Sequence, residues 1–193
     1  MKIIGNLIVL ILLVSCSKEE ITLKQYANYT VKFAKQKVNY PDKDFSILIP
    51  KSWKWKVEDY ENENIILGID AGSKPDKNGF TDIISIQKIK SFGENKDLKS
   101  EFEHYVNLVK NNSQSQKIIE SGLTDILNQK SYFLHTKSNT NTYGETEIIS
   151  FIMDSGTEGV FYNLTASASN TENLKKNMSI MIQSLKTFRI TNN

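Results

Sequence analysis

Few side chains in this sequence have the types and spacings that catalysis or metal binding requires. The two histidines, His104 and His135, have no second ligand at a metal-binding spacing such as H-x-x-x-H. His104 lies beside the apolar face of a predicted helix and His135 within a predicted strand, so we interpret both as structural. Ser85 and Lys88 have the S-x-x-K spacing, but on a strand they point to opposite faces. We therefore predict no catalytic residue and no enzyme activity.

Two acidic segments contain oxygen ligands that a hard cation prefers. Residues 58–64 carry four acidic side chains and two asparagines, which is more typical of a solvated hairpin tip than of a metal site. A segment starting at Asp76 contains half of an EF-hand loop, but Gln87 stands at the twelfth position, where an acidic residue is needed. A turn explains this segment better. We therefore predict neither a metal nor a cofactor.

Trp53 and Trp55 are the remaining candidates for a partner-binding surface. Two residues apart on an extended segment, they share one face. Lysines flank both rings, at Lys51, Lys54 and Lys56. Aromatic rings beside cations are typical of interaction sites. The alternative is that Trp53 belongs to the core and Trp55 is half-buried.

Cys16, the only cysteine, lies between an apolar and a charged run. Residues 3–14 are almost wholly apolar, which fits a secretory signal and is too short to span a bilayer as a helix. Residues 13–16, Leu-Val-Ser-Cys, resemble the bacterial lipobox, in which the cysteine sulfur receives a diacylglyceryl group and the signal is cut just before it. The resemblance implies a signal peptide over 1–15 and a bilayer anchor of acyl chains on Cys16. The alternative is an ordinary signal peptide or an uncleaved anchor with an incidental cysteine.

Lys18, Glu19 and Glu20 resemble the lysine-plus-acids export signal that follows the lipidated cysteine in surface lipoproteins of Bacteroidota. The resemblance implies a lipid-anchored protein of the cell envelope, at the outer membrane, surface-exposed or facing the periplasm. The alternative is that these charges belong to an ordinary solvated tether. With Cys16 lipidated, the exported chain contains no other cysteine, so packing rather than disulfides must stabilise it.

The whole chain of 193 residues is long enough for one domain with appendages. Its formal net charge of +2 and the lack of a basic stripe disfavour nucleic-acid binding. We predict a lipidated N-terminus and tether over 16–39 and a domain over 40–190. Some twenty extended residues would reach about 70 Å. The tether segment also fits a short first helix or strand laid on the domain.

Apolar periodicity from residue 40 onward alternates between strands and two helices. The predicted helices are amphipathic: one covers about 97–111 with Asp97 as N-cap, and the other begins with the capping box at 169–172. This pattern predicts an α+β fold, a mainly antiparallel sheet covered by the two helices. The predicted strands are 45–49, which Pro50 ends, 65–69, 81–89, 118–126, 131–136, 147–153 and 159–168.

Residues 45–53, FSILIPKSW, resemble the opening of the Mog/PsbP/DcrB-like superfamily, an alternating strand followed by proline and tryptophan. Residues 184–188, SLKTF, resemble its closing helix end. The resemblance implies an α/β/α sandwich in which Phe45, Pro50 and Trp53 are structural, and a superfamily whose members mostly lack catalysis. It includes a photosystem assembly subunit, a small-GTPase-binding factor, an envelope lipoprotein and chaperones for hydrophobic effector helices.

These observations lead to two predicted functions. The first is a non-enzymatic envelope lipoprotein whose PsbP-like domain binds or helps to assemble another envelope protein. The second is a carrier or chaperone that holds an apolar ligand or a hydrophobic helix in a groove between the sheet and the helices.

Overall fold

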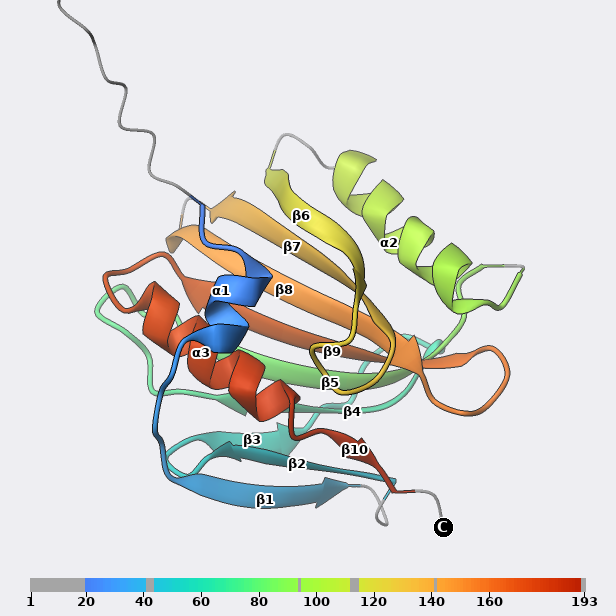
Figure 1. The fold of residues 1–193 in the computed structure, drawn as a ribbon, viewed down its shortest axis with the longest axis horizontal. Helices are drawn as coiled ribbons and strands as arrows, with labels where there is room; N and C mark the ends of the chain where they lie inside the picture. The colour runs from blue at the N-terminus through green and yellow to red at the C-terminus, as the bar shows by residue number, and fades with distance from the viewer. Residues whose placement is uncertain (1–19, 41–43, 94, 112–114, 141, 192–193) are drawn as a thin grey trace, which may run out of the picture.

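The computed structural model describes residues 20–40, 44–93, 95–111, 115–140 and 142–191. Within these residues the chain forms three helices and ten strands (Figure 1). In chain order they are α1 (Leu23–Asn28), β1 (Lys35–Tyr40), β2 (Phe45–Pro50), β3 (Lys54–Val57), β4 (Ile65–Gly72), β5 (Ile83–Lys90), α2 (Leu98–Asn111), β6 (Gln116–Thr124), β7 (Ser131–Thr140), β8 (Gly144–Asp154), β9 (Val160–Ser169), α3 (Leu174–Leu185) and β10 (Arg189–Ile190).

The strands form two antiparallel sheets. Seven strands make the large sheet in the order β3-β4-β5-β9-β8-β7-β6, and β1-β2-β10 make the small one. Helices α1 and α3 pack together over one face of the large sheet, next to the small sheet, whereas α2 lies on the other face over β6, β7 and β8 (Figure 1). The fold is therefore α+β with mostly antiparallel sheets, as predicted, although it has a third helix and a second sheet.

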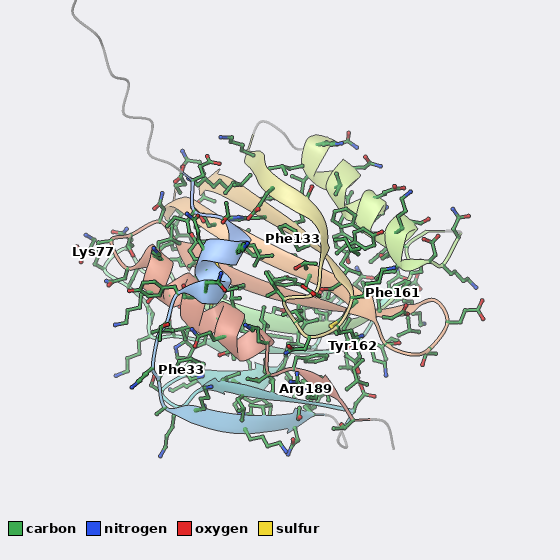
Figure 2. The ribbon with its side chains drawn as sticks, in the orientation of Figure 1. Phe33, Lys77, Phe133, Phe161, Tyr162 and Arg189 are labelled. Atoms are coloured by element: carbon green, nitrogen blue, oxygen red, sulfur yellow. The ribbon has the colours of Figure 1, made fainter. Side chains whose placement is uncertain are left out.

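Neighbouring side chains on β9 show how the large sheet separates two apolar layers. Tyr162 packs against Phe45 and Phe188 in the main core. Phe161, the preceding residue, points to the opposite face and belongs to a smaller cluster that includes Ile152 and lies under α2 (Figure 2). This opposition follows from the two-residue side-chain period of a strand.

Helix α2 begins where the sequence predicts. Asp97 Oδ1 accepts hydrogen bonds from the backbone N–H groups of Lys99 and Ser100, each at 3.0 Å. This is the N-cap arrangement that satisfies the free N–H groups of a first turn.

Helix α3 does not begin with the predicted capping box at 169–172. Ser169 is instead the last residue of β9, and its hydroxyl donates to Asp76 Oδ2 at 2.8 Å. The N-cap of α3 is Asn173, whose side chain makes no capping hydrogen bond. The capping box that the structure contains lies at α1, between Thr22 and Gln25. The predicted capping box does not form because Ser169 pairs within the sheet and its hydroxyl is hydrogen-bonded to Asp76.

Much of the predicted tether forms the folded elements α1 and β1. Leu23 and Tyr26 of α1 are buried at 2% and 0% exposure, and β1 pairs with β2 along its whole length. A tether that extends to residue 39 is therefore wrong for this segment. The alternative of a short helix or strand laid on the domain describes it.

Candidate functional site

The edge strand β3 carries Trp55, the more exposed of the two candidate tryptophans. A turn after Pro50, closed by the Trp53 N–H donating to the Pro50 carbonyl at 3.0 Å, leads into β3. On β3, Trp55 pairs with Ala71 of β4, and all four strand residues are exposed. No described strand pairs with the outer edge of β3. Its outward N–H and C=O groups are therefore available to another extended chain.

The structure separates Trp53 from Trp55. Trp53 lies before β3 begins and packs, half-buried, against the main core. Trp55 is 40% exposed at the surface. The predicted shared face does not form because the turn interrupts the extended backbone between β2 and β3. Only Trp55 remains as a surface candidate.

A groove of about 460 Å³ lies beside Trp55. Lys56 forms an ion pair with Glu58, and the Tyr60 hydroxyl lies 3.4 Å from Asp70 Oδ1. Burial raises the pKa of Asp70 above its ordinary value. The groove therefore combines cations, carboxylates and apolar surface. Its lining residues are Lys54, Trp55, Lys56, Glu58, Asp70, Gly72, Ser73, Thr81 and Ile83.

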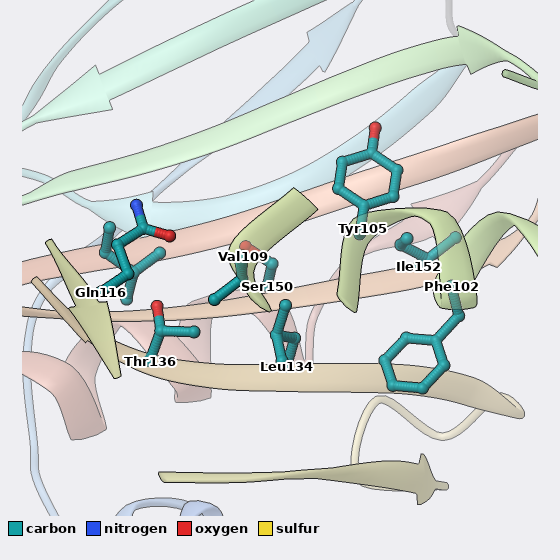
Figure 3. A pocket seen from close by; sticks show the side chains of 9 residues that line it. Phe102, Tyr105, Val109, Gln116, Leu134, Thr136, Ser150 and Ile152 are labelled. Carbon is teal, nitrogen blue, oxygen red and sulfur yellow. The ribbon is translucent and has the colours of Figure 1, made fainter. Parts of the chain in front are cut away.

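A second, smaller pocket lies between α2 and the large sheet (Figure 3). Its volume is about 160 Å³, whereas pockets for drug-sized ligands occupy roughly 300–1,000 Å³. Phe102, Tyr105 and Val109 of α2 form the helix side of the pocket, and polar Thr136 and Ser150 contribute to the sheet side. The pocket has room for a small group, but not for a helix.

A buried polar cluster joins α1 to the face of the large sheet that α1 and α3 cover. The Tyr26 hydroxyl donates to Glu147 Oε2 at 2.7 Å, and His135 Nε2 lies 3.0 Å from the same oxygen. His135 Nδ1 lies 3.3 Å from Glu120 Oε1, which also accepts the Leu23 N–H. Burial and the hydrogen bond to Glu147 raise the pKa of Tyr26 far above its ordinary value. His135 is thus fully buried and hydrogen-bonded.

This cluster was not apparent from the sequence. Tyr26, Glu120 and Glu147 are scattered along the chain. The pairing of β6, β7 and β8 brings Glu120 and Glu147 to His135, and the docking of α1 adds Tyr26. The only feature of the sequence that pointed to this cluster was Glu147, an acidic residue at the start of an otherwise apolar predicted strand.

The other predicted positions have structural surroundings. His104 stacks on Phe92, with ring centroids 5.4 Å apart. Asp76 Oδ1 accepts the N–H groups of Asn78 and Phe80, so this segment is a turn. Lys88, on β5, donates to Asp44 at 2.9 Å. Among the described residues no three His, Cys, Asp or Glu side chains gather as metal ligands would.

The predicted N-terminal signals fall at the border of the structure. Cys16, Lys18 and Glu19 lie outside the described residues. Glu20 is described, and its Oε1 accepts Lys117 Nζ at 2.9 Å. Within the described part of the chain, no helix has the length and apolar character needed to cross a membrane.

Solved structures define the class of fold. CyanoP, the cyanobacterial PsbP of Synechocystis sp. PCC 6803, is 12% identical with a TM-score of 0.57, over 83% of this chain and 95% of its own. The Ran-binding protein Mog1p of Saccharomyces cerevisiae is 8% identical with a TM-score of 0.55, over 82% and 96%. LpqN of Mycobacterium tuberculosis, which is involved in cell envelope biogenesis, is 14% identical with a TM-score of 0.52, over 82% and 91%. The chain therefore has the PsbP-like fold.

The family follows from the sequence match. The PsbP family model matches residues 35–190, which is most of the chain, so this protein belongs to the PsbP family. A comparison with curated proteins finds no match.

Proposed function

We propose that this protein is a lipid-anchored component of the bacterial cell envelope whose PsbP domain binds or helps to assemble another envelope protein without catalysing a reaction. The exposed edge of β3 carries the proposal, because Trp55 and the neighbouring groove lie beside unpaired backbone groups. Membership of a family with binding proteins among its structural relatives supports it.

The edge of β3 suits an extended segment of a partner. Such a segment adds a strand by hydrogen bonding to the open backbone edge, while side-chain pockets supply specificity. Trp55 provides an aromatic anchor of the kind that dominates binding energy. Lys54 and Asp70 beside it offer charges of both signs to the partner.

The envelope location rests on the N-terminal sequence. The lipobox-like residues 13–16 place acyl chains on Cys16, and the following Lys18, Glu19 and Glu20 match a Bacteroidota surface-export signal. The partners are then a phospholipid bilayer, through acylated Cys16, and an envelope protein. The envelope role of LpqN supports the same location.

The alternative of a carrier or chaperone has less support. An apolar ligand or a helix needs a groove larger than the 160 Å³ pocket under α2. On the other face, the space between α3 and the sheet is filled by core side chains such as Met178, Met181 and Ile182.

Chemical crosslinking of the intact lipoprotein in its own cells, followed by mass spectrometry, tests the partner. We expect Trp55→Ala to reduce crosslinking to the partner, because the anchor at the β3 edge is lost. Leu108→Ala is the matched control, since Leu108 is a 48% exposed apolar side chain on α2. An unchanged crosslink in Trp55→Ala, or an equal loss in both variants, would contradict binding at β3.

Replacement of the lipidated residue tests the anchor. We expect Cys16→Ala to accumulate as an unlipidated precursor, measured by the mass of the purified protein and by metabolic labelling with a fatty acid. Normal processing and membrane association of this variant would overturn the proposed lipidation.

A further inference from the structure

We infer that the domain lies directly on phospholipid headgroups through one rim, because the structure leaves only a few residues between the lipid anchor and the fold. The inference rests on the proposed lipidation of Cys16. The anchor rim is defined by Glu20, Lys117, Glu172 and Lys175. Glu20 shares one surface cleft with Glu172 and Lys175, and it pairs with Lys117.

Glu20, the first described residue, already contacts the sheet. Its carboxylate accepts Lys117 Nζ at 2.9 Å and lies 3.9 Å from Lys137 Nζ. Two residues later Thr22 forms the capping box of α1 with Gln25. The chain is thus held to β6 and β7 before α1 starts.

Helix α1 is fixed to the sheet by buried polar contacts. Tyr26 is fully buried, and its hydroxyl donates to Glu147 at 2.7 Å. The Leu23 N–H donates to Glu120, and His135 links both carboxylates. Breaking such a buried network leaves uncompensated polar groups in the interior, so α1 stays docked in the native state.

The docked helix limits how far the domain extends from the membrane. Cys16 and Glu20 are four positions apart, so this segment reaches at most about 14 Å. Without α1 docked, the free segment would continue to Lys35 and reach about 65 Å. The buried cluster around Glu147 therefore sets the height of the domain above the bilayer.

Charge at the anchor rim suits contact with headgroups. Lys117 and Lys175 are exposed, and Lys175 Nζ lies 5.1 Å from the centroid of the Tyr29 ring. An anionic lipid surface attracts each lysine that lies close to it. Glu172 is exposed on the same rim, so the rim is polar and mixed in charge rather than uniformly basic.

The rise per residue along β8 gives the distance between two positions that a test can compare. Glu145 of β8 lies beside Glu20, and nine positions along the strand Asp154 lies about 30 Å away. Glu158, in the loop after β8, is therefore far from the anchor rim (Figure 1). Glu158 and Glu172 are both exposed acidic side chains, which makes them a matched pair.

The experiment compares how close these two positions lie to the bilayer surface in the full lipoprotein. Glu172→Cys and Glu158→Cys are each labelled with a fluorophore, since the lipid occupies the sulfur of Cys16. The proteins are reconstituted into phosphatidylethanolamine–phosphatidylglycerol vesicles that contain a lipid with a quencher on its headgroup. We expect several-fold stronger quenching at Glu172→Cys. A flexible Gly/Ser insertion between Glu19 and Glu20 should remove the difference.

The outcomes separate this inference from the proposed function. Equal quenching at the two positions in a protein shown by mass to carry lipid overturns the anchor rim and leaves the lipidation intact. A protein without lipid at Cys16 overturns the proposed anchor itself, and with it the inference.

Discussion

Glu147 illustrates how one residue can join several elements. Burial alone would raise the pKa of this carboxyl group, but hydrogen bonds from His135 and Tyr26 outweigh burial and hold the pKa below its ordinary value. Lys137 Nζ, 3.5 Å from the second oxygen, adds a favourable charge. The ionised form is therefore favoured more in the folded than in the unfolded chain, which makes stability depend on pH.

The direction of this dependence follows from the lowered pKa. The contribution of Glu147 is fully present above its unfolded pKa and is lost as the pH falls through its folded pKa. We expect the free energy of unfolding, measured by urea denaturation, to decrease below about pH 4.5. The Glu147→Gln variant should show a flatter acid dependence and a loss of about 1–3 kcal/mol at pH 7.

Glu158→Gln is the control for this comparison because Glu158 is exposed in a loop. It should leave the free energy of unfolding within about 0.5 kcal/mol of the wild type. Identical acid profiles for the wild type and Glu147→Gln would show that the cluster does not contribute to stability.

At the level of elements, the three helices differ in how their first turns are satisfied. Helix α1 has a capping box and α2 has Asp97, whereas the Asn173 side chain makes no capping bond at α3. Helix α3 instead gains its stability from a face that is buried in the core, which includes Met178 and Ile182. The short α1 depends more on its cap, since six residues are too few for an independent helix.

Two cap substitutions should therefore have different effects. We expect Thr22→Ala to cost about 1 kcal/mol and to increase amide hydrogen exchange in α1. Asn173→Ala should cost less than about 0.5 kcal/mol, because no side-chain bond is lost. Hydrogen exchange followed by mass spectrometry measures both variants. Equal exchange in α1 of Thr22→Ala and the wild type would contradict a role for the cap.

At the scale of the molecule, one core joins both sheets. Side chains of α1, β2 and α3 pack in a single cluster with those of β4, β5, β8 and β9. The folded domain contains no cysteine after Cys16, so no disulfide contributes. The small sheet and α1 thus have no separate core on which to fold alone.

We expect the domain to unfold in a single cooperative transition that reductant does not change. Tryptophan fluorescence reports on Trp53 and Trp55 near the small sheet, whereas far-UV circular dichroism reports on the whole fold. Coincident urea transitions by both probes would agree with one core. An earlier fluorescence transition would show that β3 and its surroundings unfold separately.

The predictable part of the fold consisted of elements with a strong local pattern. Helix α2 and strands β4 to β9 matched their predicted positions within a few residues, because apolar periodicity alone determines them. Strands β3 and β10 were not predicted, and β1 only as the open alternative of a strand in the tether segment, since their residues are short or largely polar runs. They become strands by pairing with β2 or β4.

The candidate site, like the fold, was predicted only in part. The pattern of residues 51–56 indicated a surface with tryptophan and lysine, but the turn before β3 decided that only Trp55 of the two tryptophans is exposed there.

The sequence alone determined what depends on neighbouring residues: the apolar faces of α2 and the central strands, the Asp97 cap, and the lipobox-like border at Cys16. Tertiary structure decided the use of Ser169, the docking of α1, and the meeting of Tyr26 and Glu147 around His135. These contacts join segments far apart in the chain, and strand register fixes them only once the sheets have formed. For the same reason, the small number of residues that separate Cys16 from the packed part of the chain became apparent only from the packing of α1.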